Sequence, residues 1–108
     1  MDLQNQFRDD ELEKIVDEAA LYMCACPGQV AAELFHLRDL IRYQRRCLES
    51  SDTAPIVHRT IADAAVQAHQ LMEDCLRQVL ELEGWDRETL SMPAGLRERR
   101  DALIARDD

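Results

Sequence analysis

Residues 55–83 read PIVHRTIADAAVQAHQLMEDCLRQVLELE, a stretch with one proline, at its first position, and no glycine. Its apolar residues recur at spacings of three and four, which is typical of one face of an α-helix. Gly84 is expected to end this helix, which would be about 43 Å long at 1.5 Å per residue. The predicted apolar stripe comprises Val57, Ile61, Ala64, Ala65, Ala68, Met72, Cys75, Leu76, Val79 and Leu82.

A first helix is predicted from Asp9 or Asp10, because Asp10 and Glu13 have the spacing of a capping box. Residues 2–8 are a candidate backward extension of it. Its apolar positions are Leu12, Ile15, Val16, Ala19, Tyr22 and Met23. Pro27 and Gly28 indicate a hairpin turn after it.

A second helix is predicted from Cys26, as its N-cap, to about Glu49. Its main stripe comprises Val30, Leu34, Leu37, Ile41, Gln44 and Leu48, widened by Phe35, Leu40 and Tyr43. Arg38, Arg42, Arg45 and Arg46 are expected to form the one basic face of the chain. That face either complements the acidic neighbouring helices or docks an acidic partner.

The segment after Gly84 contains a predicted helical turn at residues 86–90 and a short helix from Ser91 to about Ala105. Three long helices and this short C-terminal helix predict an all-α fold. The expected architecture is an antiparallel up-down helical bundle in a single domain, residues 1–108. Because the bundle is small and the stripe of residues 55–83 is long and Ala-rich, part of that stripe is expected to stay uncovered. We therefore predict a homodimer.

The composition argues against several classes of partner. The chain has 13 basic and 22 acidic residues, a net charge of −9. Nucleic acids and anionic membranes are poor partners for so acidic a protein. There is no apolar run of membrane-spanning length, and Met1–Gln4 does not resemble the start of a signal peptide. The expected location is the cytoplasm.

The four cysteines are the most unusual chemical feature. Cys24 and Cys26 flank Ala25 directly before Pro27, where two thiols meet the start of a helix. A helix N-terminus lowers a thiol pKa and makes it a better ligand or nucleophile. Cys75 is expected near that end of the bundle. Cys24, Cys26 and Cys75 are thus a candidate site for a transition metal, with ordinary packing of free thiols as the alternative.

His36 and His69 form a second candidate metal pair. Counted from the turn near residues 51–52, they fall at the same height on facing helices. Facing histidines can bind a metal in a bundle core. Both lie beside the predicted stripes, so flank packing or solvation is the alternative.

The sequence contains no recognisable catalytic constellation. Three glycines cannot build a Gly-rich phosphate loop, and no Ser–His–Asp arrangement follows from the spacing. We therefore expect a non-enzymatic interaction or regulatory module that acts through protein–protein contacts. The alternative is a small metal-binding or thiol-redox protein that uses the Cys24/Cys26 turn.

Overall fold

A computed structural model describes residues 5–20, 26–50 and 55–93. Within these ranges the chain forms α1 (Asp9–Ala20), α2 (Cys26–Ser50) and α3 (Pro55–Glu83), and no strand. The all-α prediction is confirmed for the part described. The helix expected from Ser91 to Ala105 lies outside the described residues beyond position 93.

The start of α1 differs slightly from the prediction. The Glu11 carboxylate accepts a hydrogen bond from the Arg8 backbone N–H at 2.9 Å, and the Leu12 N–H donates to the Arg8 carbonyl at 3.0 Å. Arg8 is thus the N-cap, and Glu11 rather than Glu13 supplies the returning carboxylate of a half capping box. Residues 5–8 are not helical, so the proposed backward extension is wrong for these four residues.

Gly28 allows α1 and α2 to approach closely. α2 begins at Cys26 and has Pro27 as its second residue, so Pro27 and Gly28 belong to its first turn. A Cβ atom on Gly28 would lie 3.2 Å from the Ala19 Cβ and 3.6 Å from the Val16 Cα. This contact places the start of α2 against the last part of α1.

The end of α3 is a Schellman motif. Gly84 has φ = 78°, its N–H donates to the Glu81 carbonyl at 3.1 Å, and the Trp85 N–H donates to the Leu80 carbonyl at 2.9 Å. These are the two bonds by which a left-handed glycine ends a helix. Trp85 and Leu80 are both buried in the core. The predicted stop at Gly84 is confirmed.

Residues 86–90 make one helix-like turn, as predicted, in which the Leu90 N–H donates to the Asp86 carbonyl at 2.7 Å, but they do not continue as a helix. Asp86 Oδ1 accepts hydrogen bonds from the N–H groups of Glu88 and Thr89 at 2.9 and 3.1 Å. An isolated bridge joins Asp86 to Ser91. The aspartate side chain thus caps this turn by accepting from the backbone two and three residues later, as is common in turns.

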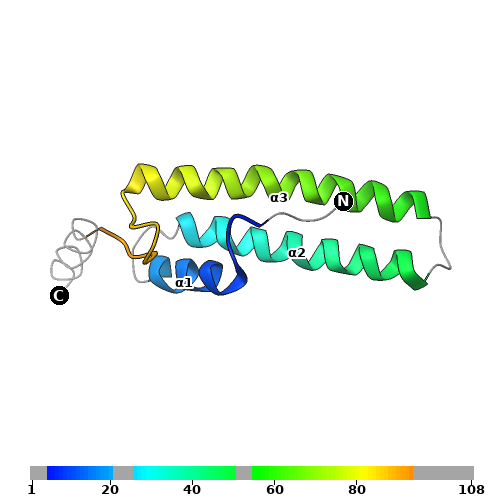
Figure 1. Cartoon of the computed structure of the whole chain (residues 1–108), viewed down its shortest axis with the longest axis horizontal. Helices are drawn as coiled ribbons and strands as arrows, with labels where there is room; N and C mark the ends of the chain where they lie inside the picture. Colours follow the sequence, from blue (N-terminus) through cyan, green and yellow to red (C-terminus); the bar gives the residue numbers. More distant parts are fainter. Residues whose placement is uncertain (1–4, 21–25, 51–54, 94–108) are drawn as a thin grey trace, which may run out of the picture.

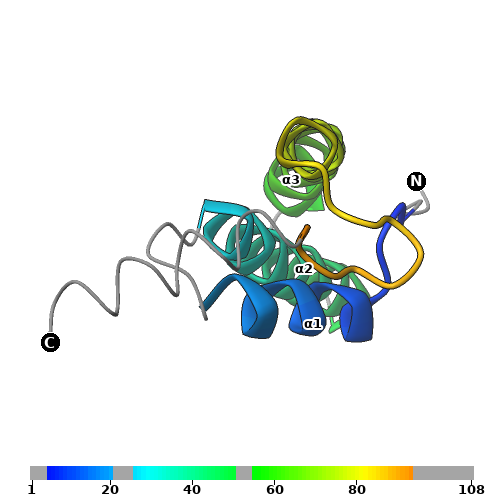
Figure 2. The same cartoon turned by 90° about the vertical axis from the view of Figure 1, so that its left-hand side faces the viewer.

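α2 lies between the other two helices. It runs alongside α3, and the shorter α1 packs on the half of α2 that begins at Cys26 (Figures 1 and 2). Contacts that join α2 to α3 pair Arg38 with His69 and Gln44 with His58. Positions further along α2 thus meet earlier positions of α3.

The hydrophobic core occupies one end of the molecule. It joins α1, the first half of α2, the second half of α3 and the loop after Gly84. Its buried members are Phe7, Leu12, Ile15, Ala19, Ala31, Leu34, Leu76, Leu80, Trp85, Leu90 and Met92. The predicted inward positions Leu12, Ile15, Ala19, Leu34 and Ile41 are all buried.

The other end of the molecule is an arm of two helices, which we call the distal arm. It comprises residues 39–50 of α2 and 55–68 of α3, beyond the reach of α1 (Figure 1). Its fully or nearly buried side chains are those of Ile41, Gln44 and Ala65. Leu40 and Tyr43, predicted to widen the inward stripe, are 39% and 57% exposed.

The inward face of α3 differs from the predicted one. Its buried residues form the inner stripe, which comprises Ala65, His69, Glu73, Leu76 and Leu80. Val57, Ile61 and Leu82, predicted to face the core, are 52%, 36% and 86% exposed. Ala65 and Leu76 were predicted correctly, but apolar periodicity alone missed His69 and Glu73, because these two inward positions carry ionisable side chains.

Candidate functional site

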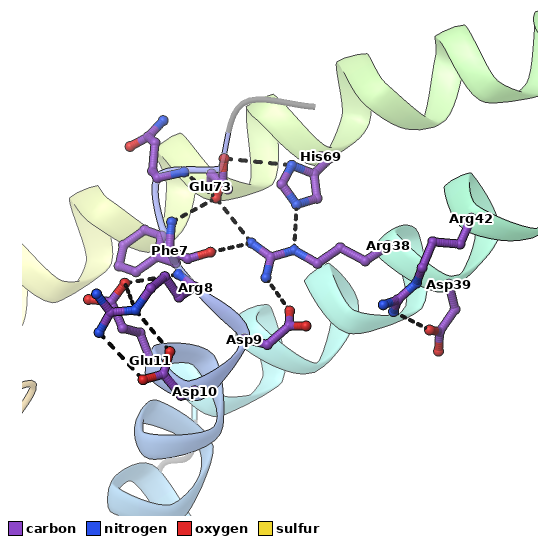
Figure 3. A network of polar contacts seen from close by, with 11 residues as sticks. Phe7, Arg8, Asp9, Asp10, Glu11, Arg38, Asp39, Arg42, His69 and Glu73 are labelled. Atoms are coloured by element: carbon purple, nitrogen blue, oxygen red, sulfur yellow. Dashed lines mark hydrogen bonds and ion pairs between the residues drawn. The ribbon is translucent and has the colours of Figure 1, made fainter. Parts of the chain in front are cut away.

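Three ionisable side chains lie buried where α2, α3 and the N-terminal segment meet. Arg38, His69 and Glu73 are 4%, 0% and 1% exposed. The prediction that Arg38 contributes to a basic surface is therefore wrong. Figure 3 shows the guanidinium of Arg38 between α3 and residues 7–9.

Arg38 donates hydrogen bonds to four groups. Its Nε–H donates to His69 Nε2 at 2.9 Å, and its Nη1–H donates to Asp9 Oδ1 at 2.5 Å. Its Nη2–H donates to the Phe7 carbonyl at 2.6 Å and lies 3.3 Å from Glu73 Oε2. The planar fork of an arginine suits such divergent acceptors, which the single ammonium of a lysine does not.

Glu73 fixes the N-terminal segment through its backbone. Its Oε2 accepts hydrogen bonds from the N–H groups of Gln6 and Phe7 at 2.8 and 3.0 Å. On the other side, Arg87 donates to the Gln6 carbonyl at 3.2 Å, and its guanidinium lies 4.1 Å from the centre of the Phe7 ring. We call the grip of Arg38, Glu73 and Arg87 on Gln6 and Phe7 the clasp.

The protonation of the cluster follows from its contacts. His69 Nε2 accepts from Arg38, so the neutral ring carries its proton on Nδ1, which lies 3.6 Å from Glu73 Oε1. Burial lowers the pKa of His69 to about 4, and the positive charge of Arg38 adds to the shift. Burial raises the pKa of Glu73, against the opposing effect of the Phe7 and Gln6 N–H groups and of Arg38.

The cluster of Arg38, His69 and Glu73 binds other residues of the same chain. Its polar atoms bond to residues 6–9 and to one another, and solvent does not reach them. Two atoms, His69 Nδ1 and Glu73 Oε1, have no hydrogen-bond partner among the described residues, and they face each other (Figure 3). We assign the cluster a structural role, which is to hold Phe7 in the core.

The sequence contained a partial signal for this cluster. His69 and Glu73 are four residues apart and lie between Ala65 and Leu76 at helical spacing. A buried carboxylate and a buried histidine on one face need hydrogen-bond donors, and a positively charged donor can serve both. Arg38 is that partner, but its burial depends on the position of residues 7–9, which no periodicity predicts.

The structure describes two of the three cysteines of the candidate metal site. Cys26 is exposed at the start of α2 and Cys75 is half-buried on α3. Cys24 lies outside the described residues. Within residues 5–20, 26–50 and 55–93, no group of three or more His, Cys, Asp or Glu side chains has an arrangement that could hold a metal ion. The three-thiol site stays a prediction.

The two histidines of the second candidate site differ in surroundings. His36 is exposed, and its Nδ1 lies 3.7 Å from Glu33 Oε2. His69 is buried and faces Arg38, which is on the same helix as His36. The two side chains therefore occupy different environments, and metal binding by this pair stays a prediction.

A second apolar stripe runs along the exposed side of α3. We call it the outer stripe: Val57, Ile61, Ala64, Ala68, Leu71, Cys75, Gln78 and Leu82. All but Ala68 and Cys75, which are half-buried, are exposed. At 3.6 residues per turn its centre lies about 120° around the helix from the inner stripe. α3 thus presents one face to α2 and another to solvent.

Comparison with models of protein families, with curated proteins and with solved structures gives no match for this chain. None of the helices, so far as the chain is described, has a segment long and apolar enough to cross a bilayer.

Proposed function

We propose that the protein is a non-enzymatic interaction module and that the outer stripe of α3 is its contact surface. The proposed assembly is a homodimer. The observation that carries the proposal is the exposure of large apolar side chains along one line of α3, with Val57 52%, Leu71 70% and Leu82 86% exposed.

The free energy available from covering these side chains is substantial. Complete burial of one Leu or Val side chain stabilises by about 1.5–3 kcal/mol. Contiguous apolar patches on a protein surface commonly mark interaction sites. Because the outer stripe runs for nearly the full length of α3, a helix of similar length is the partner that it fits best.

The distal arm supports the same proposal. Two helices without a third layer leave Ile56, Val57 and Ile61 in solvent, with Ile56 70% exposed. A domain is stable when each apolar face packs on another element. A partner helix on the outer stripe would supply that layer for the α3 side of the arm.

Replacing Leu71 with Glu tests the proposal. The wild-type protein is expected to have twice the mass of one 12.5 kDa chain by light scattering at micromolar concentration. Leu71→Glu removes a buried contact from both copies, which costs about 3 kcal/mol or more and weakens association roughly a hundredfold or more. The variant is expected to be a monomer.

Gln70→Glu is the matched control. It adds the same charge one residue away, on the polar side of α3, where Gln70 is exposed. This variant is expected to remain dimeric. A wild-type monomer, or equal effects of the two substitutions, would contradict the proposal. Circular dichroism checks that both variants keep their helices.

A further inference from the structure

We infer that two copies of the chain pack antiparallel along their outer stripes, with the two-fold axis between Ala68 and Leu71. This inference rests on the proposed function and specifies its partner and its register. It follows from the spacing of the stripe, from the sizes of its side chains and from the charges beside it.

The spacing of the outer stripe reads the same in both directions. Successive members are separated by four, three, four, three, four, three and four residues. Alternation of three and four is the pattern of a coiled-coil seam. Because the pattern is palindromic, two α3 helices can pack antiparallel so that each member of the outer stripe faces a member of the outer stripe of the second copy. The facing pairs are Val57 with Leu82, Ile61 with Gln78, Ala64 with Cys75, and Ala68 with Leu71.

The sizes of the facing side chains agree with the reversed arrangement. The two alanines at the centre, Ala64 and Ala68, each meet a larger side chain, Cys75 or Leu71 of the second copy. Alternation of small and large residues across an interface fills space without voids. In a parallel pair in register, each alanine would instead face the same alanine of the second copy, and Gln78 would face Gln78.

The charges beside the seam also favour the reversed arrangement. The flanking positions on the polar side of the seam are Thr60, Gln67, Asp74 and Glu81, of which Asp74 is half-buried and accepts a hydrogen bond from the Gln6 side chain at 2.7 Å. In the antiparallel register Asp74 lies near Gln67 of the second copy, and Glu81 lies near Thr60 of the second copy. No two acidic side chains meet at these positions, which matters for a chain of net charge −9. Opposed helix dipoles add a small favourable contribution.

In the antiparallel dimer, the distal arm and the core end of the two copies come together. Reversal about the midpoint of α3 places the distal arm of each copy beside the core end of the other. The first half of the outer stripe, Val57 to Ala68, packs on the second half, Leu71 to Leu82. The under-covered arm thus receives its third layer from the well-packed end of the second copy. A symmetric contact of this kind closes on itself and forms a dimer rather than a filament.

Disulfide trapping in the full chain tests the register. The background variant has Cys24→Ser, Cys26→Ser and Cys47→Ser, so Cys75 is the remaining thiol. The test variant adds Ala64→Cys to this background. The two positions are 11 residues apart, about 16 Å along one helix, whereas a disulfide needs Cα atoms within about 7 Å. Any link between positions 64 and 75 is therefore intermolecular.

The expected result is a disulfide-linked dimer for the test variant and an unlinked chain for the background variant after mild oxidation. Peptide mapping should join position 64 of one copy to Cys75 of the other. Gln70→Cys in the same background is the control on the opposite face, and it should not link to Cys75.

The outcomes separate the inference from the proposed function. A link between two Cys75 residues in the background variant shows a parallel seam and overturns the inference. A dimer in light scattering without the 64–75 link also overturns it, while self-association stands. A monomer in light scattering overturns both, and it assigns the outer stripe to another occupant.

Discussion

Arg38 joins parts of the chain that are distant in sequence. Its partners are on α3, on α1 and on the segment before α1. Removing one member of a buried ion pair leaves the other charge without compensation, which typically costs 3–5 kcal/mol. Arg38 is therefore expected to tolerate substitution less well than Arg42, which is exposed and paired with Asp39 at 2.6 Å.

His69 is expected to make the stability of the protein depend on pH. Its pKa is lowered from 6.5 to about 4 in the folded chain, so the unfolded chain binds the proton more tightly between these values. The contribution of the neutral His69 to the free energy of unfolding is fully present above pH 6.5 and is lost as the pH falls toward 4. At pH 5 the expected loss is about 2 kcal/mol relative to pH 7.

His69→Gln isolates this contribution, because glutamine is neutral at every pH and can accept from Arg38. The free energy of unfolding, measured by urea denaturation, is compared for the two proteins at pH 7 and pH 5. The gap in stability between them should narrow as the pH is lowered. The raised pKa of Glu73 acts in the opposite direction, but it is common to both proteins. A gap that stays constant from pH 7 to pH 5 argues against the neutral, buried imidazole.

At the scale of single elements, the end of α3 depends on the backbone of Gly84. A Cβ atom there would make an ordinary contact, 3.8 Å from the Pro93 Cγ, so the cost of Gly84→Ala is conformational. A left-handed conformation costs a non-glycine residue roughly 1–2 kcal/mol. The expected result is a fall in Tm of about 4–16 °C, measured by circular dichroism.

Asn is the matched replacement, since asparagine tolerates the left-handed region better than alanine does. Gly84→Asn should lose less stability than Gly84→Ala. The opposite order would show that space, not φ, restricts this position.

Helix positions followed from the sequence more reliably than helix faces did. Gly84 ended α3 as predicted, and the buried residues of α1 were identified because apolar spacing alone marks them. On α2 the predicted stripe included Leu34, Ile41 and Gln44 but missed Ala31 and Arg38. α3 has two stripes, so its apolar residues do not define one direction. The prediction merged members of both stripes and omitted Leu80 and Leu71, which belong to the inner and the outer stripe respectively.

The clasp could not be predicted from the sequence for a different reason. Gln6 and Phe7 precede α1 and follow no periodicity. Their positions depend on backbone hydrogen bonds to Glu73, and side-chain spacing carries no information about such bonds. The burial of Arg38 and of His69 depends on the same contacts, so it could not be predicted either.

For the whole molecule, the proposed dimer predicts that thermal stability depends on protein concentration. Anything that binds the folded chain alone raises its stability by mass action. A tenfold increase in protein concentration stabilises each chain of a dimer by about 0.7 kcal/mol, or roughly 3–5 °C in Tm. Differential scanning calorimetry at two concentrations measures this shift. Leu71→Glu should abolish it, and a wild-type Tm independent of concentration would argue for a monomer.

The clasp also constrains the order in which the chain can fold during its synthesis. Phe7 leaves the ribosome early, but Glu73 and Arg87 follow 66 residues after Phe7 and 81 residues after Gln6 respectively. At about 5–20 residues per second, that interval is roughly 3–16 seconds. During this time Phe7 lacks the part of its core that α3 and the following loop supply, and its N–H lacks the Glu73 carboxylate. The segment that completes the core is therefore among the first to be made and the last to be secured.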